Sequence, residues 1–150
     1  MKHIEYFSVR DLAGLEPVTS WLSRRLKPGD SLGLAGPLGA GKTTLTQGLA
    51  ARFGVTSLVD SPTFTLRQSY RTQHATIAEL IHYDFYRLET TEALAELGLN
   101  DDWQRSDCLL VIEWIDKFPE LLEKLSYLVT MTINQKTQER ILKVQTGENS

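Results

Sequence analysis

Eight consecutive residues carry the most specific chemistry in this 150-residue sequence. They follow the pattern G-x-x-x-x-G-K-[ST] and read Gly36-Pro37-Leu38-Gly39-Ala40-Gly41-Lys42-Thr43. In a loop of this type the backbone amides surround the β-phosphate of a nucleotide, because the helix that follows leaves its first amides without partners. The lysine reaches the β- and γ-phosphate oxygens, and the final hydroxyl binds Mg²⁺. The motif therefore predicts nucleotide binding, with Lys42 on the phosphates and Thr43 on the metal ion.

A second candidate is the acid that ends an apolar run. The residues from Leu109 to Ile112 are all apolar, and Glu113 follows them directly. A buried parallel strand has this composition, and in nucleotide hydrolases the acid at its end binds Mg²⁺ through water or polarises the attacking water. We therefore expect Glu113 to be a metal-binding or catalytic acid. Trp114 adjoins it and could be a core residue, a wall against water or a stacking surface.

Two further polar residues lie between these motifs. Thr63 belongs to a Ser-Pro-Thr run that follows the phosphate-loop helix, where switch-type NTPases carry a threonine that completes the Mg²⁺ shell. The alternative is a proline-containing turn that merely begins a strand. Asp84 shares one strand face with His82 and Tyr86, because side chains alternate along a strand. A carboxylate there suits the outer shell of Mg²⁺ or the positioning of water, and the alternative is a hydrogen-bonded surface ladder.

The segments on either side of the phosphate loop can place it as its chemistry requires. Upstream, the short apolar run Ser31–Ala35 predicts a buried strand that ends where the loop begins. Downstream, Leu45, Leu49 and Phe53 recur at helical spacing, and Gly54 stands where a helix usually ends. The sequence therefore predicts the strand, loop and helix that such a motif needs.

The remaining elements are predicted from local patterns. A first strand at His3–Val9 is expected to give Ile4, Phe7 and Val9 to the core, so the phosphate loop follows the second strand instead of the first. Next we expect a helix with Pro17 in its first turn, and then a hairpin of strands 63–71 and 77–85. A helix from Thr90 or Thr91 to Leu97, stopped by Gly98, and a turn at 100–102 should follow. The last predicted elements are a helix from Pro119 and a closing hairpin around the turn 134–138.

Together these elements predict an α/β fold: a P-loop NTPase-like sheet with parallel core strands and flanking antiparallel hairpins, with helices on both faces. The length suits a single domain at 1–146 followed by a tail at 147–150. A net charge of −3 with both signs mixed gives no basic footprint for nucleic-acid binding by the chain alone. Cys108 lies in an apolar run and is expected to be a buried thiol. No apolar run approaches the roughly 18 residues of a membrane span, so we expect a cytoplasmic protein.

The choice of nucleotide rests on motifs that are missing. A GTPase should carry D-x-x-G after the loop and an N-K-x-D guanine reader, but the D-x-x-G matches, Asp11 to Gly14 and Asp30 to Gly33, precede the loop and N-K-x-D does not occur. ATP is therefore favoured. A small-molecule kinase would need clustered arginines in a lid, whereas the arginines here are scattered. A nucleotide-gated interaction module that does not need hydrolysis remains an alternative from another class.

Five motifs occur in a fixed order along the chain: Gly36 to Thr44, Ser61 to Phe64, His82 to Leu88, Glu96 to Leu99 and Ile112 to Trp114. In their order and spacing they resemble the TsaE (YjeE) family of bacterial ATPases. The resemblance implies binding of ATP and Mg²⁺, association with the TsaB and TsaD proteins, and contact with tRNA only through that complex. It also implies a role in transferring a threonylcarbamoyl group to adenosine 37 of tRNAs that read codons beginning with A, with ATP hydrolysis resetting the complex between turnovers.

The resemblance assigns roles to residues at matching positions. It implies that Lys42 and Thr43 are the phosphate and metal residues and that Glu113 is the Walker B acid. Thr63 becomes the switch-like residue, and Asp84 becomes a metal-shell or catalytic acid. On this basis we expect Lys42 and Mg²⁺ to neutralise the charge that develops at the β–γ bridge while Glu113, or Asp84 through water, orients the nucleophile.

Three further positions follow from the resemblance. Trp114 is placed beside the site. Gly14 stands where family members often carry a threonine near the adenine, so this contact is expected from backbone atoms. Arg140 matches a basic residue of the last hairpin that approaches the nucleotide. No arginine is placed as an internal finger, so we expect slow hydrolysis by the chain alone and completion of the site by a partner.

Overall fold

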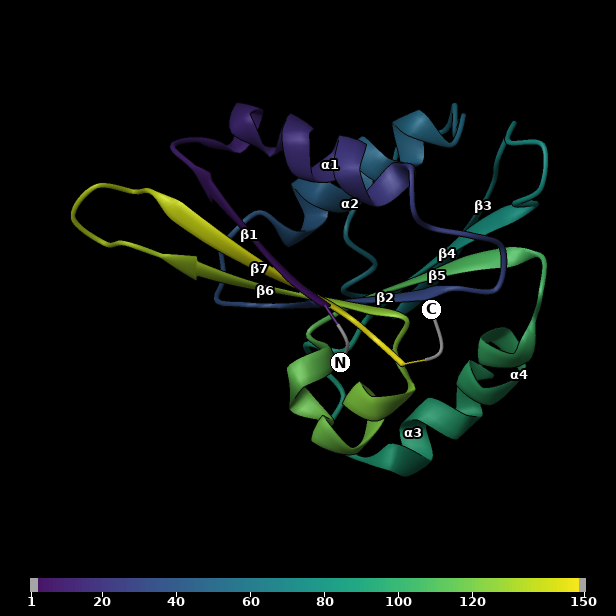
Figure 1. Cartoon of the computed structure of the whole chain (residues 1–150). Helices are drawn as coiled ribbons and strands as arrows, with labels where there is room; N and C mark the ends of the chain where they lie inside the picture. The colour runs from purple at the N-terminus through teal and green to yellow at the C-terminus, as the bar shows by residue number, and fades with distance from the viewer. Residues whose placement is uncertain (1–2, 149–150) are drawn as a thin grey trace.

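The computed structural model describes residues 3–148, which form one seven-stranded sheet with helices on both faces (Figure 1). The order of the strands across the sheet is β1-β7-β6-β2-β5-β4-β3. Their bounds are β1 (His3–Val9), β2 (Ser31–Ala35), β3 (Arg67–Arg71), β4 (Glu79–Asp84), β5 (Cys108–Glu113), β6 (Tyr127–Ile133) and β7 (Arg140–Thr146). The predicted single domain begins in residues outside the described range, and the predicted tail at 147–150 ends outside it, so both bounds stay predictions.

The centre of the sheet is parallel and its margins are antiparallel. Strands β6, β2, β5 and β4 run in the same direction, whereas β7 and β1 on one side and β3 on the other run against their neighbours. Every residue of β2 and β5 is buried, which explains why both read as continuous apolar runs without alternation. The predicted α/β fold with parallel core strands and antiparallel hairpins is confirmed.

Each face of the sheet is covered by its own set of helices. The helices α1 (Glu16–Ser23) and α2 (Lys42–Arg52) lie above the sheet in Figure 1, and α1 follows a short 3₁₀ turn, η1 (Leu12–Leu15), that Asp11 caps. The helices α3 (Thr91–Glu96) and α4 (Leu99–Gln104) and the 3₁₀ turns η2 (Ile115–Lys117) and η3 (Pro119–Lys124) lie below it. Two separate hydrophobic clusters fill the spaces between these layers.

Alternation along β5 sends side chains into both clusters and fixes where Glu113 points. Leu109 and Val111 belong to the cluster under α1 and α2, and Leu110 and Ile112 belong to the opposite one. Burying each of these aliphatic side chains stabilises the fold by about 1.5–3 kcal/mol. Because side chains alternate, Glu113 faces the same side as Val111 and therefore lies toward α2.

The predicted turn at 100–102 is wrong, because residues 99–104 form helix α4. Gly98 does end α3 as predicted, but with a φ of 83° it also serves as the N-cap residue of the next helix. Asp101 and Asp102 then lie in the first turn of α4, where carboxylates interact favourably with the helix dipole. The polar residues that suggested a turn are therefore those of a helix N-terminus.

Three other elements differ from their predictions in detail. The hairpin of β3 and β4 is antiparallel as predicted, but β3 begins only at Arg67, because Leu66 has a φ of 66° and interrupts the extended backbone. The segment from Pro119 is helical but of the 3₁₀ type. Strand β1 has the predicted bounds, yet Ile4 is 45% exposed, because it lies on the opposite face of β1 from Phe7, whose ring packs on Trp21 of α1.

The helices of the described region are short. None of those found in residues 3–148 combines the length and the apolar character that crossing a membrane requires. The longest, α2, has 11 residues.

Candidate functional site

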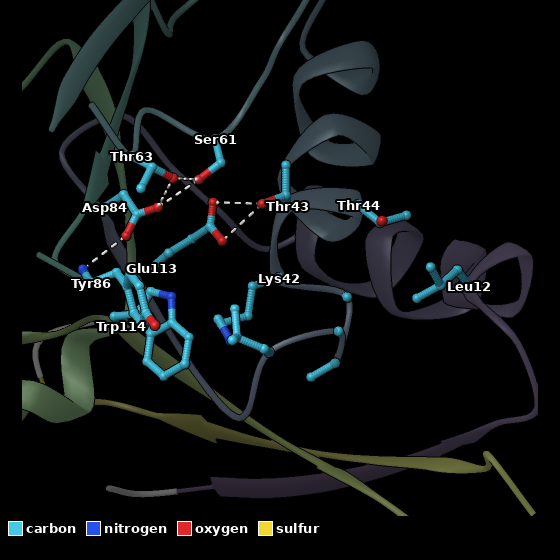
Figure 2. Close-up of a pocket in the computed structure, with 14 residues that line it drawn as sticks. Leu12, Lys42, Thr43, Thr44, Ser61, Thr63, Asp84, Tyr86, Glu113 and Trp114 are labelled. Carbon is cyan, nitrogen blue, oxygen red and sulfur yellow. Dashed lines mark hydrogen bonds between the residues drawn. The ribbon is translucent and has the colours of Figure 1, made fainter. Parts of the chain in front are cut away.

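The carboxyl ends of β2, β5 and β4 meet at one edge of the parallel region, and a cleft of about 370 Å³ opens there. Ligands of open α/β sheets bind at such strand ends. The cleft is lined by residues from the phosphate loop, the start of α2, the loop before β3 and the ends of β4 and β5, as Figure 2 shows: Leu12, Leu38, Gly39, Ala40, Gly41, Lys42, Thr43, Thr44, Ser61, Thr63, Asp84, Tyr86, Glu113 and Trp114. The structure therefore brings together the phosphate loop and both predicted acids.

The phosphate loop leaves the first amides of α2 without side-chain partners. Gly41 is the N-cap residue of α2, has a φ of 113° and provides no side chain to cap the helix. The first amides of a helix have no partners within it, so this terminus is suited to an anion. Gly36, with a φ of 148°, passes so close to β6 that a Cβ there would lie 2.7 Å from the carbonyl oxygen of Met131. Both glycines are therefore required by the backbone path of the loop.

Lys42 is folded back onto its own loop. Its Nζ donates hydrogen bonds to the carbonyl oxygens of Gly36 at 2.5 Å and Pro37 at 2.9 Å, and it lies 3.9 Å from the centroid of the Trp114 ring. Burial of the ammonium lowers the pKa of Lys42 from its usual value, although nearby carboxylates, of which Glu113 has the largest influence, oppose this effect. The ammonium of Lys42 is thus held beside the phosphate loop by two carbonyl oxygens and an aromatic ring.

Glu113 joins the phosphate-loop helix to the sheet. Thr43 Oγ1 donates to the carboxylate and lies 3.0 Å from Oε1 and 3.1 Å from Oε2, as the dashed lines in Figure 2 show. On the sheet side, Nε2 of His82 lies 2.6 Å from Oε2. Glu113 is only 2% exposed, and Leu34 of β2 pairs with it in the parallel ladder. The predicted metal residues Thr43 and Glu113 are therefore in direct contact.

Asp84 anchors the Ser-Pro-Thr loop to the sheet. Its Oδ2 accepts hydrogen bonds from Ser61 Oγ at 2.5 Å and Thr63 Oγ1 at 3.1 Å, and its Oδ1 accepts one from the backbone amide of Tyr86 at 2.9 Å. Asp84 is the ladder partner of Glu113 on the neighbouring strand, so the two carboxylates end adjacent strands. The structure thus places Thr63 on Asp84, and Asp84 beside Glu113.

Trp114 forms one wall of the cleft. Its φ of 60° turns the chain sharply after Glu113, and its backbone amide donates to the carbonyl oxygen of Leu34 at 3.0 Å. The indole ring contacts the Tyr86 ring, with 4.9 Å between centroids, as well as the Lys42 ammonium. Of the three possibilities for Trp114, its position agrees with a wall residue that shields the lysine.

Four predicted nucleotide-binding residues do not line the cleft: Gly36 and Pro37 at the start of the phosphate loop, and Arg140 and Gly14 outside it. Arg140 donates from Nε to the carbonyl oxygen of Ala40 at 3.0 Å and from Nη2 to that of Gly39 at 2.9 Å, so it braces the phosphate loop from β7. Gly14 lies at the end of η1, where its amide is bonded to Asp11. The predicted adenine contact at Gly14 and the predicted nucleotide contact of Arg140 stay predictions.

Sequence reasoning missed four residues of the site. Leu12 lines the cleft and is 38% exposed, yet an isolated leucine gives no sequence signal for a binding role. Ser61 and Tyr86 line the cleft as well, and His82 lies behind it on Glu113. The last three belong to motifs that the sequence did single out, and period-2 alternation placed His82 and Tyr86 on the face of Asp84. Their roles could not be predicted, because the sequence does not show which side chains they contact in the fold.

The donors present suit a metal ion that is shared with a phosphate. Within residues 3–148 no group of three or more His, Cys, Asp and Glu side chains is arranged to hold a metal ion. Mg²⁺ is usually bound by one or two carboxylates together with substrate phosphates and water, so a dedicated protein cage is not required. Thr43, Glu113 and Asp84 supply oxygen atoms of the hard type that Mg²⁺ prefers, next to the predicted phosphate position.

Comparisons with known proteins identify a matching family model, similar sequences and a similar structure. The model of the family described as "Threonylcarbamoyl adenosine biosynthesis protein TsaE" matches residues 9–142. Proteins named tRNA threonylcarbamoyladenosine biosynthesis protein TsaE are similar in sequence: that of Bacillus subtilis is 42% identical over 64% of this chain and 57% of its own length. The one from Mycobacterium tuberculosis is 37% identical over 70% of this chain and 65% of its own length. The one from Synechocystis is 37% identical over 77% of this chain and 73% of its own length.

The matched segment thus spans between about half and three quarters of these relatives. In structure, the chain is similar to the Bacillus subtilis YdiB protein, with a TM-score of 0.76 and 26% identity over 99% of this chain and 89% of that one. From the extent of the family match and the identity to these relatives, the chain belongs to the TsaE family of threonylcarbamoyl adenosine biosynthesis proteins.

Proposed function

We propose that this chain is a Mg²⁺-dependent ATPase of the cytoplasm that supports formation of threonylcarbamoyladenosine at position 37 of tRNAs reading codons that begin with A. In this proposal it acts with TsaB and TsaD and contacts tRNA only through their complex. Hydrolysis of ATP resets the complex between rounds of modification and does not drive the transfer of the threonylcarbamoyl group.

One observation carries the proposal. The N-terminus of α2, which no side chain caps, lines one cleft together with Lys42 and the two strand-end carboxylates, Glu113 and Asp84. The free amides and Lys42 supply positive charge for a polyphosphate, whereas Glu113 and Asp84 would repel it in the absence of a cation. The combination therefore favours a nucleoside triphosphate that arrives with Mg²⁺.

Each residue then has a defined task. Lys42 exchanges the carbonyls of Gly36 and Pro37 for the β- and γ-phosphate oxygens, and the Thr43 hydroxyl and the Glu113 carboxylate provide the oxygens that would hold the metal ion. Bound Mg²⁺ supplies charge neutralisation on the transferring phosphoryl group. Glu113 orients the attacking water, and Asp84 keeps the loop with Thr63 against the site.

No arginine of residues 3–148 lines the cleft, where a guanidinium could stabilise the transition state. Arg140 contacts the phosphate loop, but its Nε and Nη2 are bound to the carbonyl oxygens of Ala40 and Gly39. An arginine supplied from outside accelerates other NTPases by about 10³–10⁵. We therefore expect the chain alone to hydrolyse ATP slowly, and a partner to complete the site.

Hydrolysis of γ-labelled ATP tests the proposal when it is measured for the chain alone and with TsaB and TsaD. We expect slow turnover alone, a rate increase of at least ten-fold with the partners, and ATP-dependent threonylcarbamoyladenosine on tRNA. The Lys42→Ala variant should lose hydrolysis alone, hydrolysis with the partners, and the ATP-dependent modification of tRNA. Equal and fast hydrolysis with and without partners would argue against completion by a partner.

The same assay separates the alternatives. If a slowly hydrolysing ATP analogue supports many rounds of tRNA modification, the chain is a nucleotide-gated interaction module. If the label is transferred to a small molecule and not to water, the chain is a kinase.

A further inference from the structure

We propose that His82 is a positioning residue that holds the Glu113 carboxylate in its working orientation. The proposal rests on the ATPase function proposed above, because it concerns the acid that orients the attacking water. The His82 side chain is fully buried on β4, and its Nε2 lies 2.6 Å from Oε2 of Glu113. It does not line the cleft, so it can affect the reaction only through Glu113.

The environment of His82 is unfavourable for a residue that only fills the core. In residues 3–148 its Nδ1 is the single buried side-chain nitrogen or oxygen without a hydrogen-bond partner. A buried polar atom without a partner destabilises the fold, and such an atom calls for an explanation beyond packing. Leu80, two residues earlier on the same face of β4, shows that an aliphatic side chain suits this layer. The hydrogen bond to Glu113 is the compensating feature.

The hydrogen-bond pattern also assigns the proton of the imidazole. A carboxylate can only accept, so Nε2 of His82 must carry the proton that is donated to Oε2 of Glu113. The contact with Glu113 therefore requires an imidazole that carries a proton on Nε2.

The two donors to Glu113 differ in what else they do. The Thr43 hydroxyl comes from α2 and also has the proposed metal ion as a partner, whereas His82 comes from β4 and bonds to Glu113 alone. His82 therefore keeps the carboxylate fixed from the sheet side even when the contacts of Thr43 rearrange. Carboxylates and histidines that orient active-site groups in this way typically change activity by about 10–100-fold when they are removed.

Kinetics of His82 variants test this role. Replacement of His82 by leucine removes the hydrogen-bond donor. The asparagine side chain is too short for its amide nitrogen to reach Glu113, whereas glutamine places its amide nitrogen near the position of Nε2. We expect kcat with the partner proteins to fall about 10–100-fold in His82→Leu and His82→Asn and to recover largely in His82→Gln. The affinity for ATP without Mg²⁺ should stay within about two-fold in all three, because His82 is outside the cleft.

A matched control separates positioning from general damage to β4. Leu80→Val changes a buried residue on the same strand face but touches neither Glu113 nor the cleft, so it should lower the melting temperature without lowering kcat. Full turnover in His82→Leu, or equal losses in the Leu, Asn and Gln variants, would overturn the proposal.

A second measurement does not depend on turnover and so stays decisive even if the ATPase proposal fails. The chain has three histidines, and His82 is the buried one, so ¹⁵N-detected NMR of the imidazoles can isolate it by comparison with His82→Gln. We expect an exchange-protected Nε2–H tautomer whose proton signal moves upfield in Glu113→Ala. An Nδ1–H tautomer, or a signal that Glu113→Ala leaves unchanged, would contradict the proposed contact.

Discussion

Glu113 and Asp84 end adjacent strands, but their partners give them different tasks. Glu113 receives its hydrogen bonds from Thr43 on the phosphate-loop helix and from His82 behind it, so it faces the predicted metal position. Both oxygens of Asp84 are engaged with the loop of Ser61 and Thr63 and with a backbone amide. The difference favours Glu113 as the acid that acts on water and Asp84 as the acid that holds the loop.

The two acids should therefore respond differently to loss of charge. Glu113→Gln keeps the cradle of amides, so we expect nearly unchanged ATP affinity and a fall in single-turnover hydrolysis of about 10²–10⁴-fold, in the range of general acid–base effects. Asp84→Asn should instead speed hydrogen exchange in residues 57–66, because the hydroxyls of Ser61 and Thr63 lose their charged acceptor. Normal hydrolysis by Glu113→Gln would remove Glu113 from the mechanism.

Cys108 is expected to be chemically inert in the folded chain. Burial at the start of β5 raises the pKa of its thiol to about 12, so very little thiolate exists at neutral pH. We expect iodoacetamide to modify Cys108 at pH 8 only in denaturant, as mass spectrometry of the intact chain would show. Rapid modification of the native chain would mean that β5 opens locally, and added Mg·ATP should then slow the reaction.

At the scale of elements, one buried carboxylate ties α4 to the edge of the sheet. Asp102 accepts two hydrogen bonds from the Arg67 guanidinium of β3, at 2.7 and 3.1 Å, and one from the Tyr83 hydroxyl of β4 at 2.5 Å. Burial alone would raise the pKa of Asp102, but these hydrogen bonds outweigh burial and lower it below its usual 3.8. The lower helices are therefore fixed to the strand that ends in Asp84.

This cluster makes stability sensitive to acid. Because the pKa of Asp102 is lower in the folded than in the unfolded chain, its contribution is fully present above about pH 4 and is lost as the pH falls through the folded pKa. We expect Asp102→Asn to lose about 1–3 kcal/mol of unfolding free energy at pH 7, moderated by the partial exposure of Arg67. Urea titrations at pH 7 and pH 3 should show a smaller difference between wild type and variant at pH 3, and an equal difference at both would contradict the assignment.

The sequence predicted elements whose patterns are local and failed where distant contacts decide. Strand β2, the phosphate loop, α2 and β5 were all predicted, because apolar runs, glycine placement and the terminal acid Glu113 need only their own neighbourhood. Helix α4 was missed, because its stability depends on the contacts of Asp102 with two strands. In the site, the partnership of His82 with Glu113 depends on the register between β4 and β5, which no local pattern encodes.

For the whole molecule, nucleotide binding and global stability should be linked. A ligand that binds only the folded state adds about 2.7 kcal/mol at 100 times its Kd, which for a chain of this size raises the melting temperature by roughly 5–10 °C. We expect this shift with Mg·ATP in differential scanning fluorimetry and a smaller one with Mg·GTP. Lys42→Ala should show no shift with either nucleotide, and an equal shift in this variant would mean that ATP binds elsewhere.

The pairing of the first and last strands has a consequence for how the protein is made. Strand β1 has β7 as its neighbour in the sheet, with Val9 opposite Arg140, and Arg140 also donates to the carbonyls of Gly39 and Ala40. As the chain leaves the ribosome, β1 and the phosphate loop emerge before β7, so the contacts of Arg140 with the loop cannot form until β7 has been translated. If the chain binds a nucleotide as proposed, we expect a nascent chain to bind it tightly only after β7 has been translated.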